Sequence, residues 1–219
     1  MQAMDHRERQ RELVPRPDDA TLPPDLVVAR VLSDALHTVV LVEGASDRVA
    51  LLTLARRYSR DLAAEGVGVV PMGGATSVGR YWSALGPGGA GLRLAGLCDV
   101  AEARHFSHAL RRSGHEVVAA PGDLERHGVF VCTADLEDEL IRALGMAAVE
   151  EAVDAAGELG SLRTFQQQPA QRGRSAQAQV RRFLGTRSGR KIQYAGLLVE
   201  RLDLARVPAP LGRLLAHVA

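Results

Sequence analysis

Carboxylates stand where apolar segments of this sequence stop, and this pattern is the one best suited to chemistry. Residues 39–42 are apolar and lead directly into Glu43, with Asp47 four positions later. Another apolar run ends at Asp99, with Glu102 three positions on. An ionised group loses favourable hydration inside a protein, so a carboxylate at the end of a buried segment costs stability. We therefore treat these four residues as candidates for function.

A third group of acids follows the apolar segment that ends near residue 134. Asp135 and Glu137 come first, and Asp138 and Glu139 follow them. We expect Asp138 and Glu139 to face solvent. The acids also have structural alternatives, because Asp47 can cap a helix and Asp135 and Glu137 suit the positive N-terminus of the next helix.

Short apolar runs alternate with helical periodicity, and this alternation predicts an α/β fold with a mostly parallel sheet flanked by helices. We expect strands at 38–42, 66–74, 92–99, 115–120 and 128–134. The helices between and after them are expected at 26–36, 46–64, 75–85, 101–113, 134–145 and 146–159. Ligands of open α/β sheets bind beyond the carboxyl ends of the strands, so the carboxylates should meet at one edge.

Converging carboxylates repel one another unless a cation lies between them, and hard oxygen ligands suit Mg²⁺ or Mn²⁺. Such ions can stabilise both the attacking and the leaving oxygen in phosphodiester chemistry, which allows a two-metal site. Three glycines at the same edge would let a phosphate or backbone approach closely: Gly44, Gly73 and Gly74.

Composition divides the chain into three parts: a proline-bearing arm at 1–24, an α/β domain at 25–160, and a helical segment at 161–219 that packs on it. The helical segment has eleven basic and two acidic residues, a net charge of +9 that suits a polyanion such as DNA. The arginines expected to hold DNA are Arg172, Arg174, Arg181, Arg182, Arg187 and Arg190. Lys191 is the one lysine in a chain with 27 basic residues.

Neither a membrane span nor a signal sequence is apparent, so we expect a cytoplasmic protein. Cys98 and Cys132 lie in apolar runs, without CxxC spacing, and are expected to be reduced core residues.

Several segments together resemble a known family. LVEGASD, VVPMGGATSVGRY, LCDVAE, ADLEDELIRALG and GRKIQYA, between about residues 38 and 200, resemble the TOPRIM half of overcoming-lysogenisation-defect (OLD) family nucleases. The resemblance implies a Rossmann-like TOPRIM fold and DNA cleavage with two metal ions. By resemblance, Glu43 and Asp47 match the first acidic pair, and Asp99 the first aspartate of a DxD motif. Glu137 matches a later metal ligand and Lys191 the basic residue that stabilises the transition state.

Two departures from the family pattern bear on activity. Ala101 stands at the second aspartate of DxD, with Glu102 one residue later, which puts one metal site in doubt. The chain contains no GxxxxGK[ST] phosphate loop, so a standalone TOPRIM protein would need a separately encoded ATPase subunit.

The leading hypothesis is therefore a Mg²⁺- or Mn²⁺-dependent endonuclease, a phosphodiester hydrolase acting on DNA. Glu43, Asp47, Asp99, Glu102 and Glu137 would hold the metal, and Glu43 or Glu137 could instead act as general base or acid. The alternative is a catalytically degenerate TOPRIM module that binds nucleic acid or a partner ATPase. A Rossmann-like nucleotide binder is disfavoured because no GxGxxG follows the first strand. The sequence leaves a homodimer open.

Overall fold

Four apolar segments form a single parallel sheet in the computed structural model, which describes residues 23–118, 120–187 and 189–219. The strand order is β2-β1-β3-β4. The strands are β1 (Thr38–Val42), β2 (Val67–Pro71), β3 (Arg93–Asp99) and β4 (Val129–Cys132). Because every neighbouring pair is parallel, all four carboxyl ends lie at the same edge of the sheet. The strand order reverses between β1 and β3, which places the ligand-binding edge of an α/β sheet there.

Alternating side chains of β1 reach two separate cores. Val40 and Val42 belong to one apolar cluster, and Val39 and Leu41 to the other. All five residues of β1 are buried, so this strand is covered on both faces. Central parallel strands of this kind are near-continuous apolar runs, which is why the expected strand at 38–42 is confirmed residue for residue.

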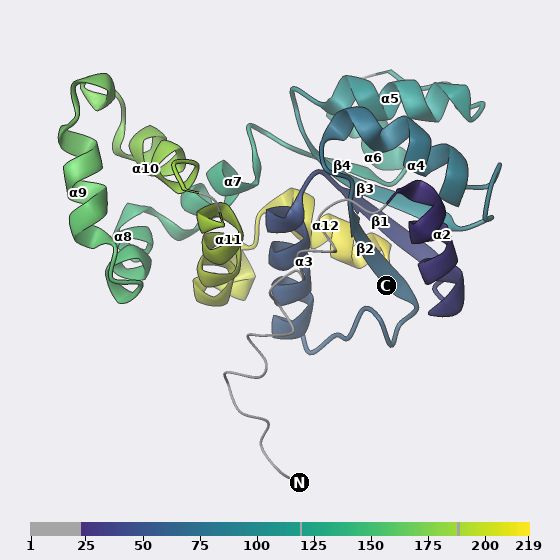
Figure 1. The fold of residues 1–219 in the computed structure, drawn as a ribbon, viewed down its shortest axis with the longest axis horizontal. Helices are drawn as coiled ribbons and strands as arrows, with labels where there is room; N and C mark the ends of the chain where they lie inside the picture. Colours follow the sequence, from purple (N-terminus) through teal and green to yellow (C-terminus); the bar gives the residue numbers. More distant parts are fainter. Residues whose placement is uncertain (1–22, 119, 188) are drawn as a thin grey trace, which may run out of the picture.

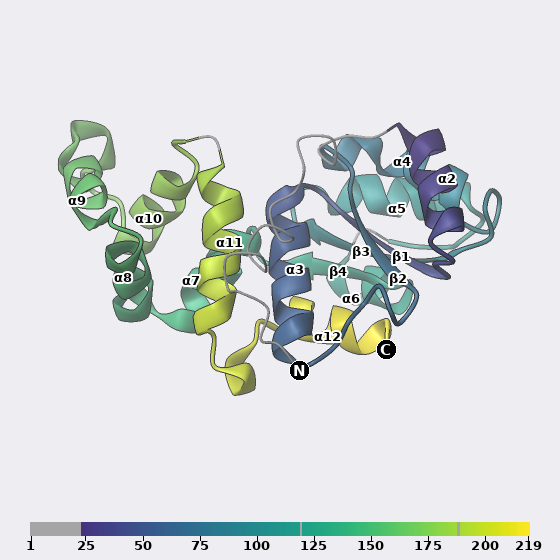
Figure 2. The ribbon, with the colours of Figure 1, turned by 60° about the horizontal axis from the view of Figure 1, so that its bottom comes forward.

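Helices cover both faces of the sheet (Figures 1 and 2). On one side lie α2 (Pro24–Ser33), α4 (Val78–Leu85), α5 (Ala103–Arg112) and α6 (Pro121–Arg126). On the other lie α3 (Ala45–Arg57) and α12 (Ala209–His217). Farther from the sheet stand α7 (Leu136–Leu144), α8 (Met146–Ala155), α9 (Leu159–Gln167), α10 (Ala176–Leu184) and α11 (Arg190–Arg201). Short 3-10 turns are η2 (Ala75–Ser77), η3 (Pro169–Gln171) and η4 (Leu204–Arg206).

Two arginines tie the end of the chain to the sheet-bearing part. The Arg57 guanidinium donates to the carbonyl oxygens of Val199 and Leu202, at 2.7 and 2.5 Å. Arg60 donates to the carbonyl of Leu215 at 2.5 Å. Because these carbonyls lie at the ends of α11 and α12, both helices are fixed beside α3, and α11 packs along it.

The expected strand at 115–120 is absent from the described residues. The carbonyl of Val117 instead accepts a hydrogen bond from Arg111 at 2.9 Å, and the N–H of Val118 donates to the Asp123 carboxylate. Side chains therefore satisfy the backbone that a neighbouring strand would have paired.

The helix expected at 46–64 ends earlier, at Arg57, and short turns lead from there to β2. Most of the expected arm at 1–24 lies outside the described residues. Cys98 and Cys132 are buried and free, as expected for reduced core residues, and burial raises the pKa of both thiols. None of the described helices is long and apolar enough to span a bilayer.

Candidate active site

Glu43 and Asp47 lie together where β1 gives way to α3. Gly44 is the N-cap of α3, and its N–H donates to Asp47 Oδ2 at 2.8 Å. Asp47 thus caps the helix, as its structural alternative predicts, while its charge also raises the pKa of the nearby Asp99. Burial raises the pKa of Asp47 itself to about 7, against the hydrogen bond from Gly44 and with support from Glu137 and Glu43.

Asp99 is the last residue of β3, the strand that pairs with β1 where the strand order reverses. Burial, together with the charges of Asp135, Asp47 and Glu43, raises the pKa of Asp99 to about 7. The pKa of Glu43 is raised by burial first and by Glu102 second. The carboxylates from β1 and β3 therefore act on one another electrostatically.

Glu102 reaches this group from the turn after β3, although Ala101 occupies the expected acidic position. Glu102 is the N-cap residue of α5, and its Oε2 lies 3.2 Å from His105 Nε2, three residues later. Ala101 is exposed. His105 was not identified from the sequence; its i,i+3 spacing from Glu102 on a helix was the available signal.

Glu137 and Asp135 come from the turn that joins β4 to α7. Asp135 is the N-cap of α7, and its Oδ1 accepts the N–H of Asp138 at 2.8 Å. Its Oδ2 accepts from Arg181 Nε at 2.6 Å. Glu137 is 4% exposed, which is low for a carboxylate and requires a partner.

Lys191 supplies that partner from the first turn of α11. Its Nζ lies 3.2 Å from Glu137 Oε2, and its side chain remains 48% exposed. Burial lowers the pKa of Lys191, but Glu137, Asp135 and Asp47 outweigh that effect, so its pKa is raised. The ammonium therefore stays protonated beside the carboxylates.

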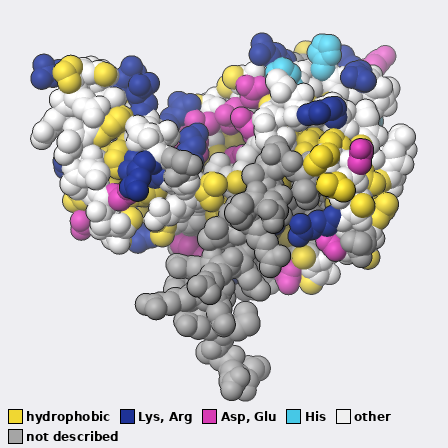
Figure 3. All heavy atoms as spheres, viewed as in Figure 1, with side chains coloured by type: hydrophobic (Ala, Val, Ile, Leu, Met, Phe, Trp, Pro, Cys, Tyr) yellow, Lys and Arg dark blue, Asp and Glu magenta, His cyan; other side chains and the backbone are white. Residues whose placement is uncertain are grey.

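These acids form what we name the acidic rim. It consists of Glu43, Asp47, Asp99, Glu102, Asp135 and Glu137. The space-filling view shows acidic side chains gathered in a hollow between the sheet-bearing part and the outlying helices (Figure 3). All rim residues except the buried Glu137 are partly exposed, so a large substrate can reach the rim.

The chemistry of the rim fits a hard divalent cation. All of its donors are carboxylate oxygens, the ligands that Mg²⁺ and Mn²⁺ prefer. Burial and mutual repulsion raise the pKa of Glu43, Asp47 and Asp99. A bound cation would stabilise the ionised carboxylates and so lower these pKa values again. In the part of the chain that the structure describes, no three Asp, Glu, His or Cys side chains converge into a preformed metal cluster.

The glycines after β2 leave space beside the rim. Gly73 and Gly74 have φ angles of 69° and 122°, which favour glycine. The Gly74 N–H donates to the Glu43 carbonyl at 3.1 Å, and a Cβ built on Gly74 would meet no atom within 4 Å. Gly44 has φ −142°, an extended conformation open to any residue.

The expectation that Asp138 and Glu139 face solvent is wrong. Glu139 is 6% exposed; its Oε1 accepts the N–H of Thr133 at 2.8 Å and its Oε2 lies 2.7 Å from Arg142. Asp138 pairs with Arg142 at 2.8 Å and accepts from Gln177. Glu139 lies three positions after the buried Leu136 on the apolar face of α7, so helical spacing could have indicated its burial.

The six arginines expected to hold DNA lie in two kinds of surroundings. Arg190 is 7% exposed, pairs with Glu158 at 2.9 Å and lies over the Phe183 ring at 4.0 Å. The remaining five are exposed: Arg172, Arg174, Arg181, Arg182 and Arg187. Arg190 therefore anchors the start of α11, next to Lys191, rather than presenting charge to solvent.

Comparison with known proteins bears directly on the fold. Residues 37–100 match the family described as "Overcoming lysogenization defect protein-like, TOPRIM domain". The resemblance drawn from the sequence is thereby confirmed, and the α/β architecture is that of a Rossmann-like TOPRIM domain. No curated protein matches the sequence.

Two solved structures resemble nearly the whole chain. The C-terminal region of the Burkholderia pseudomallei OLD protein has a TM-score of 0.64 and 18% identity, covering 84% of this chain and 96% of that one. The C-terminal region of the Xanthomonas campestris pv. campestris OLD protein has a TM-score of 0.62 and 24% identity, covering 84% and 94%. At these identities the likeness describes the fold, which extends through the helices beyond the sheet.

Proposed function

We propose that this protein is a Mg²⁺- or Mn²⁺-dependent nuclease that hydrolyses phosphodiester bonds in DNA. The observation that carries the proposal is that the acidic rim and Lys191 lie together at the carboxyl edge of the sheet and shift one another's pKa values. The resemblance to OLD-like TOPRIM domains supports the same chemistry.

Five carboxylates are proposed to hold the metal: Glu43, Asp47, Asp99, Glu102 and Glu137. When bound, the cation would supply positive charge that offsets the carboxylates and stabilises negative charge on phosphate oxygens. Asp135 joins them in the rim, but its two oxygens already accept from Asp138 and Arg181. We therefore assign Asp135 to positioning Arg181.

Hydrolysis requires that water attack phosphorus while a phosphorus–oxygen bond breaks. Glu43 or Glu137 takes the proton of the attacking water, and the leaving oxygen takes a proton from solvent water. Lys191 places its ammonium beside the phosphate, where it stabilises the charge that develops in the transition state. Five exposed arginines contact the phosphate backbone without reading sequence: Arg172, Arg174, Arg181, Arg182 and Arg187.

Cleavage of supercoiled plasmid and linear DNA tests the proposal, with Mg²⁺, Mn²⁺ or EDTA. Metal-dependent cutting that Glu43→Ala and Lys191→Ala each abolish, while both variants remain folded, is the expected result. Glu151→Ala is the matched control, since Glu151 is exposed on α8. Cutting that persists in Glu43→Ala would remove the rim from the mechanism.

A degenerate module that binds nucleic acid or a partner ATPase is the second candidate. Ala101 at the second DxD position favours it, as does the lack of a three-ligand cluster among the described residues. Mn²⁺ titration separates the two, because a degenerate site should bind the ion weakly or not at all. Both the active nuclease and the degenerate module are compatible with a separately encoded ATPase partner and with a homodimer.

A further inference from the structure

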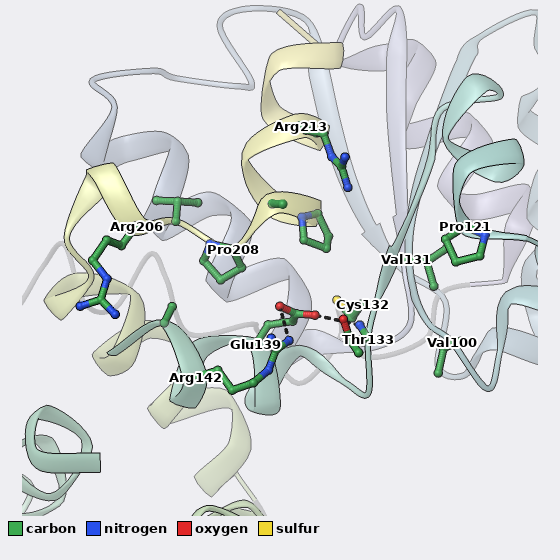
Figure 4. A pocket seen from close by; sticks show the side chains of 14 residues that line it. Val100, Pro121, Val131, Cys132, Thr133, Glu139, Arg142, Arg206, Pro208 and Arg213 are labelled. Carbon is green, nitrogen blue, oxygen red and sulfur yellow. Dashed lines mark hydrogen bonds and ion pairs between the residues drawn. The ribbon is translucent and has the colours of Figure 1, made fainter. Parts of the chain in front are cut away.

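A cavity of about 730 Å³ lies at the carboxyl end of β4, between α7 and the N-terminus of α12 (Figure 4). Apolar side chains form much of its wall, including Val100, Val131, Pro208 and Pro210. Val100 is 49% exposed, which is high for a valine that follows a core strand. Cavities of this size commonly hold a small molecule or a single nucleotide.

The polar part of the wall is positively charged. Arg142, Arg206 and Arg213 line the cavity, and Glu139 is the one acid among its lining residues. Both Glu139 oxygens are already bonded, to the Thr133 N–H and to Arg142 (Figure 4). Its negative charge is therefore balanced before any ligand arrives.

Two of the arginines remain able to bind an anion. Arg206 is exposed, and its guanidinium makes no hydrogen bond or ion pair with any described residue. Arg213 is 58% exposed and pairs with Glu125 at 3.0 Å, an exposed contact that contributes little stability. The N-terminus of α12, at Ala209, lines the same cavity and adds the positive end of a helix dipole.

The cavity and the acidic rim share two loops. Val100 lines the cavity and directly follows Asp99 of the rim. Thr133 lines the cavity and precedes the rim residue Asp135 by two positions. A strand held at the rim therefore needs only to cross these loops to reach the arginines.

We propose that this cavity is a nucleotide subsite, which binds one nucleotide of the DNA strand whose phosphodiester lies at the rim. The inference rests on the proposed function and adds a second basic surface, separate from the arginines of α10 and its flanking turns. The valines and prolines contact base and sugar, and Arg206 and Arg213 bind the phosphate. Contact with an apolar wall would distinguish a nucleotide from a bare anion.

Binding of a fluorescent single-stranded oligothymidylate in EDTA tests the subsite without requiring cleavage. Arg206→Ala/Arg213→Ala should weaken binding roughly tenfold or more, because two charged hydrogen-bond donors are lost. Arg93→Ala/Arg112→Ala removes the same charge from exposed sites at the start of β3 and the end of α5. Equal weakening in both double variants, or no binding by the wild type, would overturn the subsite.

A neutral variant separates shape from charge. Ala209→Trp places a bulky side chain on an exposed lining position and should weaken oligonucleotide binding, whereas Ala205→Trp, exposed and outside the lining, should not. Competition by inorganic phosphate as strong as that by thymidine monophosphate would reduce the cavity to a simple anion site. Equal competition by polyglutamate would assign it to an acidic protein segment, and either outcome refutes the proposal.

The two proposals fail separately. If Glu43→Ala abolishes cleavage but the cavity variants bind and cut DNA normally, the nuclease stands and the subsite falls. If the wild type never cuts but the cavity variants lose oligonucleotide binding, the subsite stands without the nuclease.

Discussion

Lys191 Nζ lies 3.2 Å from Glu137 Oε2, and the two residues are 54 positions apart in the chain. Glu137 lies in the first turn of α7 and Lys191 in the first turn of α11, so the contact joins two helix N-termini. Neither residue has a charged partner at this distance within its own helix. The pair therefore links the acidic rim to the C-terminal helices.

Replacing Lys191 by Ala should lower the rate of DNA cleavage by about 10²-fold or more, the range seen when one preorganised donor to a transition state is removed. Single-turnover cleavage with saturating Mg²⁺ measures the chemical step. Arg201→Ala removes an exposed charge from the last turn of α11 and should leave the rate unchanged. A rate within twofold of wild type in Lys191→Ala would exclude the ammonium from the transition state.

The stability of the metal-free protein should fall between about pH 4 and pH 7. The pKa of Asp47 and Asp99 is raised from 3.8 to about 7 in the folded state, so the folded protein binds more protons than the unfolded chain in this window. Raised carboxylate pKa values stabilise the fold at low pH, and that stability is lost as pH rises through 7. Thermal unfolding in EDTA from pH 5 to 8 measures the slope, and Asp47→Asn/Asp99→Asn should flatten it.

Divalent metal should raise the melting temperature most at high pH, where the rim carboxylates are charged. Ligands that bind only the folded state stabilise it in proportion to the logarithm of their concentration. Melting curves with and without Mn²⁺ at pH 8 test this, with Asp99→Asn expected to remove the gain. Asp154→Asn, on the exposed face of α8, should retain it. An equal gain in both variants would place the metal elsewhere.

Glu102 should contribute to metal affinity in place of the missing aspartate at position 101. Its charge raises the pKa of Glu43 more than any other charged group does, which puts it beside the rim. Glu102→Gln should weaken Mn²⁺ binding measured by calorimetry, whereas Glu116→Gln, exposed after α5, should not. Unchanged Mn²⁺ affinity in Glu102→Gln would show that Glu102 is not a metal ligand and that its role is limited to the contact with His105.

Glu158 should stabilise the start of α11 through Arg190. Arg190 donates to both Glu158 oxygens, at 3.1 and 2.9 Å, and Tyr194 donates to the same carboxylate at 3.0 Å. Glu158→Gln would leave the buried Arg190 charge unpaired, at a cost of roughly 3 kcal/mol in denaturant unfolding.

Glu150→Gln breaks the exposed pair with Arg163 and should leave the free energy of unfolding almost unchanged. The Glu158 variant should also slow cleavage, since Lys191 follows Arg190 directly. Equal small losses in the two variants would mean that the buried pair does not fix α11.

Local patterns were enough to predict most of the sheet and its edge. The strand at 38–42 is a continuous apolar run. Glu43 follows it directly, although burying a carboxylate there costs stability, and this cost points to a functional role. The false strand at 115–120 had the same apolar character. Its backbone is satisfied by Arg111 and Asp123, which are contacts that no local pattern contains.

The rest of the site depends on contacts between distant positions. Glu139 is expected from the sequence to face solvent, yet its carboxylate accepts from the Thr133 N–H and pairs with Arg142. The sequence does not single out Arg206 and Arg213, because only the turn of the chain after α11 brings them beside β4. Pairings of this kind are set by tertiary packing, which a single sequence does not display.

The attachment of α11 through Arg57 and Glu158 has a consequence for how the molecule opens. Among the described residues, the core between the sheet and α2, α4, α5 and α6 contains none from α11, whereas Lys191 reaches the rim only while α11 stays docked on α3. Partial unfolding that released α11 would leave the strands protected from hydrogen exchange but disassemble the reactive centre. The proposed cleavage activity should then disappear at a lower denaturant concentration than the sheet structure does.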